Sequence, residues 1–257
     1  MKTIILCGGK GTRLREETEY KPKPMVRIGG MPILLHIMKI YAYYGYKDFV
    51  LCLGYKGDAI KEYFLTLSDY SQDFAYDFSN DKINYLGGHH GIDYKITFVN
   101  TGEDTLSGER VKIAASKYAK DDQFMVTYGD GLSNVDIKKL VNFHNSHNKE
   151  SAGTITGVHP SSKYGLLKFD SNNKILKFEE KPQLQDYING GFMIFEKSAL
   201  KYIKEGEMLE DSLKRMTEAG KLNINVHDDF WHSMDTYKDF EDLNKLWKNN
   251  PKWKVWD

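Results

Sequence analysis

Short apolar runs that end at a glycine recur along the first half of the chain. They occupy residues 4–7 (IILC), 48–54 (DFVLCLG) and 124–128 (FMVTY). An apolar run of this length between turn residues is typical of a strand that is buried on both faces of a parallel sheet. The pattern therefore predicts three buried strands.

Segments with helical periodicity separate these strands. In residues 32–44 apolar side chains recur at intervals of three and four, and Pro32 stands where a helix begins. Further helices are predicted at residues 58–67, 110–119 and 136–147, and a further strand at 94–99. A strand, a helix and another strand in this order form a βαβ unit, in which the strands are parallel and helices cover the sheet.

The last third of the chain mixes short strands with helices. Strands are predicted at residues 153–158, 164–169, 175–178 and 191–195, and helices at 198–203 and 209–219. We expect these strands to continue the same sheet. Between residues 68 and 91 the pattern weakens, which indicates an insertion or a long loop that can contain a hairpin. Because no internal repeat or linker divides the sequence, residues 1–257 are predicted to form a single domain.

The charge balance argues against one class of partner, the nucleic acids. Lys and Arg together number 36, as do Asp and Glu, so the formal net charge is zero. Nucleic-acid affinity depends on a clustered positive surface, which this balance argues against. The two cysteines lack the spacing of a disulfide framework or a zinc site. With no signal peptide and no apolar run of membrane-spanning length, we expect a soluble cytoplasmic protein that does not bind membranes.

The most informative local signal is the segment 8–13 (GGKGTR), directly after the first strand. Glycines at this place let main-chain N–H groups approach an anion closely, at the sheet edge where α/β folds bind ligands. The segment is neither a Walker loop nor a dinucleotide fingerprint, which needs a third glycine where this chain has Leu14. A tight turn is the alternative, and three glycines followed by Arg13 favour phosphate binding over it.

Four other motifs gain meaning only as a set, because each alone is explained equally well by a turn, a helix cap or a solvated surface. They are residues 21–25 (KPKPM), 128–131 (YGDG), 178–182 (FEEKP) with 189–192 (NGGF), and 230–236 (FWHSMDT). Prolines restrict the backbone around the lysines of the first motif. Asp130 and Asp235 supply carboxylates in the second and the fourth, and Thr236 is the predicted N-cap of a last helix.

The order and spacing of all these motifs resemble those of the sugar-1-phosphate nucleotidylyltransferase family, over essentially the whole chain. Within that family the chain is most similar to the cytidylyltransferases, through residues 16–18 (EET), 100–102 (NTG), 107–110 (SGER) and its tryptophan-bearing C-terminus. The resemblance implies a Rossmann-like α/β fold, a three-layer sandwich around a mostly parallel mixed sheet. His232 and Ser233 stand where the family commonly has Gln and Pro, a departure that leaves the base and the sugar less defined.

The resemblance also implies roles for individual residues. The implied catalytic set is Arg13, Lys23, Asp130 and Asp235, of which the two aspartates bind Mg²⁺. The implied nucleotide site consists of Leu6, Gly8, Gly9, Gly11, Thr12, Arg13, Lys23, Arg110 and Gly129. The implied sugar-phosphate site consists of Glu180, Lys181, Asn189 and Gly190. The stretch 68–91 resembles an oligomer-contact element, so a homo-oligomer is expected.

The implied reaction is transfer of a cytidylyl group from CTP to α-D-glucose 1-phosphate, which gives CDP-glucose and pyrophosphate. Its implied setting is the synthesis of nucleotide sugars for O-antigen or another surface polysaccharide. The sequence leaves open the same chemistry with another nucleoside triphosphate, or with another phosphorylated sugar or small metabolite. A glycosyltransferase would usually show a D-x-D metal motif, which is absent. A non-catalytic sensor of nucleotide sugars would have no need to keep both aspartates.

Overall fold

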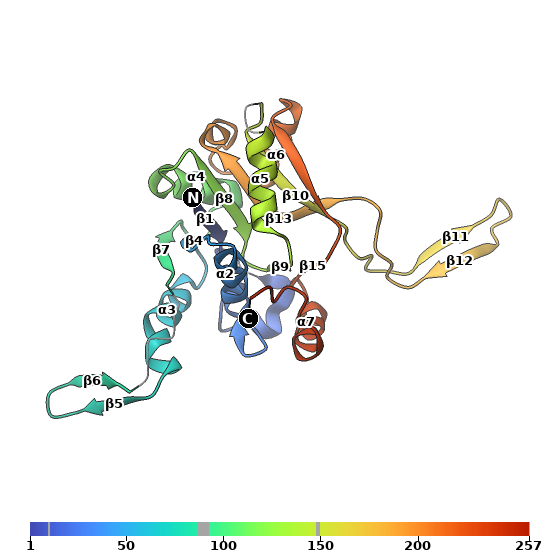
Figure 1. The fold of residues 1–257 in the computed structure, drawn as a ribbon. Helices are drawn as coiled ribbons and strands as arrows, with labels where there is room; N and C mark the ends of the chain where they lie inside the picture. Colours follow the sequence, from blue (N-terminus) through green and yellow to red (C-terminus); the bar gives the residue numbers. More distant parts are fainter. Residues whose placement is uncertain (10, 87–92, 148–149, 257) are drawn as a thin grey trace.

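The computed structural model, which describes residues 1–9, 11–86, 93–147 and 150–256, is built around a seven-stranded sheet (Figure 1). Within this sheet β13 runs antiparallel to both of its neighbours, and the other adjacent strands are parallel. In spatial order the strands are β14 (Leu222–His227), β10 (Gly153–Val158), β13 (Ile188–Glu196), β8 (Gln123–Tyr128), β1 (Lys2–Leu6), β4 (Asp48–Leu53) and β7 (Lys95–Asn100). The predicted α/β class with a mostly parallel mixed sheet is therefore confirmed.

Helices cover both faces of the sheet and make three layers (Figure 1). Successive side chains of β1 point to opposite faces, so that Ile5 packs with one helix layer and Ile4 with the other. The first layer contains α2 (Ile33–Tyr43), α3 (Gly57–Ser71), α5 (Ile137–His147) and α7 (Tyr237–Asn249). The second contains α4 (Ser107–Tyr118), α6 (Leu209–Glu218) and the 3₁₀ helix η3 (Lys197–Tyr202). No helix in the described part of the chain combines the length and the apolar character needed to cross a bilayer.

The main sheet and its helices differ from the sequence-based prediction at β14 and at the start of α4. The prediction lacks β14, whose alternating apolar and polar residues form a half-exposed strand at the edge of the sheet. Helix α4 begins at Ser107, ahead of the predicted start at Arg110. Its N-cap residue, Leu106, makes no side-chain hydrogen bond to the helix, so the usual sequence signal for a helix start is missing.

Two β-hairpins project from the body on opposite sides (Figure 1). One pairs β5 (Phe74–Asp77) with β6 (Lys82–Tyr85) inside the predicted insertion 68–91, of which residues 87–91 lie outside the described chain. The other pairs β11 (Leu166–Phe169) with β12 (Ile175–Glu179). The expectation that all late strands continue the main sheet is wrong for β11 and β12, because they pair with each other and leave both faces exposed.

Short elements lie at the edge of the sheet where β1 and β8 end. They are η1 (Thr12–Leu14), α1 (Arg15–Thr18), η2 (Lys23–Met25), the pair β2 (Arg27–Ile28) and β3 (Met31–Pro32), and the pair β9 (Gly131–Ser133) and β15 (Trp231–Ser233). Helix α7 follows β15, and the hydroxyl of Thr236 accepts a hydrogen bond of 3.3 Å from the main-chain N–H of Asp239. The predicted N-cap is therefore confirmed.

The C-terminal tryptophans pack on the body of the protein around His36. His36 is fully buried, and its Nε2 lies 2.8 Å from the carbonyl oxygen of Ile28. Its Nδ1 accepts a hydrogen bond of 3.2 Å from the indole N–H of Trp253, and Trp247 packs edge-on against the same imidazole. Both contacts are satisfied by the neutral imidazole with its proton on Nε2. Burial accordingly lowers the pKa of His36 to about 4.

We predict that acid destabilises the fold through His36. The unfolded chain binds a proton here near pH 6.5, whereas the folded chain binds it only near pH 4, so stability falls as the pH drops through this interval. The full loss is on the order of 3 kcal/mol. Urea unfolding of wild type and His36→Gln at several pH values measures it. The stability advantage of wild type over the variant should shrink toward pH 4, and an advantage independent of pH would contradict the prediction.

Candidate active site

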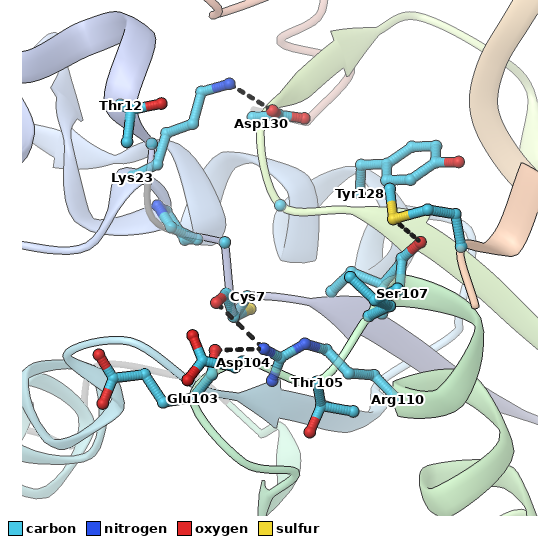
Figure 2. Close-up of a pocket in the computed structure, with 18 of the residues that line it drawn as sticks. Cys7, Thr12, Lys23, Glu103, Asp104, Thr105, Ser107, Arg110, Tyr128 and Asp130 are labelled. Atoms are coloured by element: carbon cyan, nitrogen blue, oxygen red, sulfur yellow. Dashed lines mark hydrogen bonds and ion pairs between the residues drawn. The ribbon is translucent and has the colours of Figure 1, made fainter. Parts of the chain in front are cut away.

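A cleft of about 540 Å³ opens at the edge of the sheet where β1 and β8 end (Figure 2). This volume is typical of sites for small molecules, and open α/β sheets place their ligands at this edge. The cleft is lined by the residues predicted for the nucleotide and the metal, namely Leu6, Gly8, Gly9, Gly11, Thr12, Arg13, Lys23, Arg110, Gly129, Asp130 and Asp235. The fold thus gathers segments from five distant parts of the sequence.

The glycine-rich loop enters the cleft directly from β1. Strands β1 and β8 are parallel neighbours, and just beyond β8 the main-chain N–H of Gly129 donates to Leu6 O at 3.1 Å. The loop and Asp130 therefore start from adjacent points of the sheet edge. Gly11 has a φ of 62°, in the left-handed region where a side chain is strained, so this turn depends on glycine. Lys10, between the glycines, lies outside the described residues.

Asp130 and Asp235 are far apart in sequence and adjacent in space. Strand β15 pairs antiparallel with β9, with Ser233 opposite Gly131. One step further along, the main-chain N–H of Met234 donates to Asp130 O at 2.9 Å. This short ladder places the two aspartates side by side, and both line the cleft.

Lys23 joins the two carboxylates. Its ammonium lies 2.6 Å from Asp130 Oδ2 and 2.9 Å from Asp235 Oδ1. Figure 2 shows the contact with Asp130 across the cleft. Prolines flank the lysine, and Pro24 packs so closely on Gly129 that a Cβ there would lie 3.0 Å from the Pro24 ring. The stiff segment thereby aims the lysine at the end of β8.

In this cluster, ionic contacts shift the pKa values of Lys23 and Asp235 more than burial does. Burial lowers the pKa of Lys23, but the carboxylates of Asp130 and Asp235 raise it above its ordinary value overall. Burial likewise raises the pKa of Asp235, but Lys23 and Arg13 bring it below its ordinary value overall. The guanidinium of Arg13 is largely exposed and lies 3.8 Å from Asp235 Oδ1. Lys23 and Asp235 therefore both keep their charges at neutral pH.

Arg110 ties together the loops that form the floor of the cleft (Figure 2). Its guanidinium donates to the main-chain carbonyls of Gly8 at 3.3 Å, Leu53 at 3.0 Å, Gly102 at 2.7 Å and Glu103 at 3.0 Å. These carbonyls lie at the ends of β1, β4 and β7, so one buried side chain fixes three strand ends relative to one another. The predicted contact of Arg110 with the nucleotide stays a prediction.

The residues predicted for the sugar phosphate are not among those that line the cleft: Glu180, Lys181, Asn189 and Gly190. Asn189, which precedes Gly190 on β13, lies near the cleft. Its Nδ2 donates to the hydroxyl of Tyr128 at 3.4 Å, and Tyr128 lines the cleft. Glu180 and Lys181 follow β12 at the base of the hairpin, where Lys238 of α7 lowers the pKa of Lys181. Their roles stay predictions.

Further residues line the cleft that the sequence analysis did not assign to it: Cys7, Pro24, Glu103, Asp104, Thr105, Leu106, Ser107, Tyr128 and Met208. The loop 103–107 follows β7 and so reaches the same sheet edge as the glycine-rich loop. The sequence does carry one signal for this loop: it follows a predicted parallel strand, and loops in that position form the ligand-binding edge of an α/β sheet. Tyr128 donates a hydrogen bond of 2.6 Å to Glu210, and burial together with this carboxylate raises the pKa of Tyr128 far above its ordinary value.

Comparisons with known proteins identify the family of this chain. The sequence profile of the family described as "Nucleotidyl transferase" matches residues 2–250. A protein of Bacillus subtilis (strain 168), named "Probable glucose-1-phosphate cytidylyltransferase", is 43% identical over 260 residues that cover 100% of both chains. The "Glucose-1-phosphate cytidylyltransferase" of Salmonella typhi is 40% identical over 263 residues, again with 100% of both chains covered.

A solved structure extends the likeness to three dimensions. HddC from Yersinia pseudotuberculosis superposes with a TM-score of 0.70 and 25% sequence identity, over 96% of this chain and 99% of that chain. The family profile covers all seven strands of the sheet and every segment that lines the cleft. This chain therefore belongs to the nucleotidyl transferase family.

Proposed function

We propose that this protein transfers the cytidylyl group of CTP to α-D-glucose 1-phosphate, which forms CDP-glucose and pyrophosphate. The observation that carries the proposal is the meeting of the glycine-rich loop, Lys23, Asp130 and Asp235 in one cleft. Membership in the nucleotidyl transferase family supports the class of reaction. Two relatives named for this reaction, 43% and 40% identical over the whole chain, support cytosine and glucose as the base and the sugar.

The proposed reaction requires no side-chain nucleophile or general base from the protein. A phosphate oxygen of the sugar phosphate attacks the α-phosphorus of CTP, and the bond to the bridging oxygen of the β-phosphate breaks, so that pyrophosphate leaves with the electron pair. Because a sugar phosphate is already an anion at neutral pH, no side-chain base is needed. The protein must hold two anions in line and stabilise the charge that gathers on the phosphates. Main-chain N–H groups of the loop, the fork of Arg13 and the ammonium of Lys23 suit that task.

Asp130 and Asp235 fit Mg²⁺. They offer hard carboxylate oxygens, and one ammonium already reaches both, so a single cation in that place contacts the two carboxylates. Mg²⁺ is commonly held by one or two carboxylates, with substrate phosphates and water as further ligands. We therefore propose that these aspartates hold Mg²⁺ against the phosphates of the nucleotide. When bound, the ion would neutralise phosphate charge.

We also propose that the chain is a single catalytic domain that assembles into a homo-oligomer through its hairpins. The β11–β12 hairpin exposes apolar residues, among them Leu167, Phe169, Leu176 and Phe178, which are 52%, 64%, 65% and 62% exposed. A two-stranded hairpin alone is marginally stable in water, and exposed apolar patches mark interaction surfaces. A second copy of the chain, which carries the same hairpins, would cover them.

Substrate choice is tested by release of pyrophosphate with each of the four nucleoside triphosphates against a panel of sugar 1-phosphates. We expect CTP with glucose 1-phosphate to give the highest kcat/KM, by about tenfold or more over UTP, because contacts to the base discriminate at this level. Equal or better use of UTP would contradict the choice of cytosine. Release with a different sugar phosphate would keep the chemistry and change the substrate.

Replacing either aspartate tests the metal assignment. In the presence of Mg²⁺, Asp130→Asn and Asp235→Asn should each lower kcat/KM by about 10² to 10³, as expected for loss of one electrostatic contact to the reacting phosphates. Asp58→Asn serves as the control, because Asp58 is exposed and pairs with Lys61 away from the cleft. Folded aspartate variants that keep more than about a tenth of wild-type activity would contradict the assignment.

The oligomer is tested by changing the hairpin. The double variant Leu176→Asp and Phe178→Asp should have a lower mass than wild type in sedimentation equilibrium, because charged groups oppose burial of this surface. Lys168→Asp, also on the hairpin, is the control for an added acidic group and should keep the wild-type mass. A monomeric wild type, or a double variant with the wild-type mass, would contradict the proposal.

A further inference from the structure

Lys23 occupies the space between the two carboxylates to which the metal is assigned. Its ammonium lies 2.6 Å from Asp130 and 2.9 Å from Asp235, and its side chain is 14% exposed, against 27% for each aspartate. Charge-assisted hydrogen bonds of this kind are roughly twice as strong as neutral ones. A cation of the protein itself therefore fills the position that a divalent ion would need.

The cleft offers few protein ligands to a metal ion that would displace Lys23. Ser233 donates to Asp235 Oδ2 at 3.1 Å, and Oδ1 faces two cations, Lys23 at 2.9 Å and Arg13 at 3.8 Å. Within the described ranges, no group of three or more His, Cys, Asp or Glu side chains is arranged to hold a metal ion. A bare Mg²⁺ ion would thus have to displace an ammonium while gaining only two protein carboxylates, fewer ligands than its octahedral shell needs.

A bound nucleotide gives the lysine a second partner. Lys23 and the glycine-rich loop line the same cleft, so a triphosphate on the loop lies within the space that the lysine faces. The ammonium is carried on a flexible four-carbon stem and can turn from one acceptor to another. Several negative charges on the triphosphate compete for it, and phosphate oxygens supply the metal ligands that the protein lacks.

We propose that Lys23 is a placeholder for the metal. In the free protein its ammonium blocks Mg²⁺ from Asp130 and Asp235, and it leaves the two carboxylates free when nucleotide phosphates bind it instead. This inference rests on the proposed function, since it assumes a nucleoside triphosphate on the loop. The exchange makes metal and nucleotide binding mutually dependent. By linkage, each ligand strengthens the binding of the other by the same factor.

Titration of the full chain with Mn²⁺, followed by electron paramagnetic resonance of the free ion, tests the exchange without an activity assay. Lys23→Met removes the ammonium and nearly keeps the length of the side chain. Without nucleotide, this variant should bind Mn²⁺ about tenfold more tightly than wild type, because the hydrogen bonds of Lys23 no longer compete. The analogue α,β-methylene-CTP should tighten Mn²⁺ binding by a larger factor in wild type than in Lys23→Met.

Matched variants separate this exchange from a general effect of charge. Lys23→Arg keeps a cation and should keep the weak metal binding of wild type. Lys21→Met removes a lysine of the same segment that pairs with Glu17, and it should leave metal binding unchanged. Asp130→Asn added to Lys23→Met should abolish the gain, which locates the ion at the aspartates.

Two results would overturn the proposal: Mn²⁺ binding by a folded Lys23→Met variant that is no tighter than in wild type, or an equal gain in Lys21→Met. Circular dichroism of each variant establishes folding. The proposed function fails in a different way, through a wild type that forms no CDP-glucose. That result would leave the comparison of Mn²⁺ binding without nucleotide fully interpretable, so the two failures are distinguishable.

Discussion

The double ion pair of Lys23 with Asp130 and Asp235 is the interaction around which the cleft is organised. Burying a charge is costly unless a partner of opposite sign is held in good geometry, and here each charge supplies that partner for another. The three side chains come from separate parts of the chain, and each is brought to the meeting point by its own backbone constraint. These constraints are a proline-flanked 3₁₀ helix, the end of a buried strand and a short antiparallel ladder.

The parallel sheet makes this meeting possible. Because β1, β4, β7 and β8 run in the same direction, the loops after them open at one edge, and Arg110 ties three of these strand ends together through main-chain carbonyls. The described glycines of the glycine-rich loop thus line the same cleft as two acids and the ammonium that bridges them. In the proposed reaction, such a site needs no nucleophile or general base of its own. Its proposed task is to position two anions and to balance their charge.

Much of this arrangement could be predicted from the sequence, and the limits have physical causes. The buried strands were predictable because strands covered on both faces are continuously apolar, and Thr236 was recognisable as a helix cap from its neighbours. The meeting of Asp130 with Asp235 followed from the family resemblance alone, since no local pattern encodes the pairing of β9 with β15. That Lys23 bridges both acids depends on tertiary contacts and could not be predicted. The strands β11 and β12 are predicted, but their pairing as a separate hairpin is not, because a short strand pattern does not specify which sheet the strand joins.

The most direct test of the account is the reverse reaction, with labelled pyrophosphate and Mg²⁺ added to the full chain. In a direct transfer between two bound anions, label should enter CTP from CDP-glucose and pyrophosphate, with release of glucose 1-phosphate. No label should exchange into CTP when every sugar compound is omitted. Label that enters CTP without any sugar would contradict direct transfer, and a folded wild type that yields no CTP from CDP-glucose would contradict the assigned reaction.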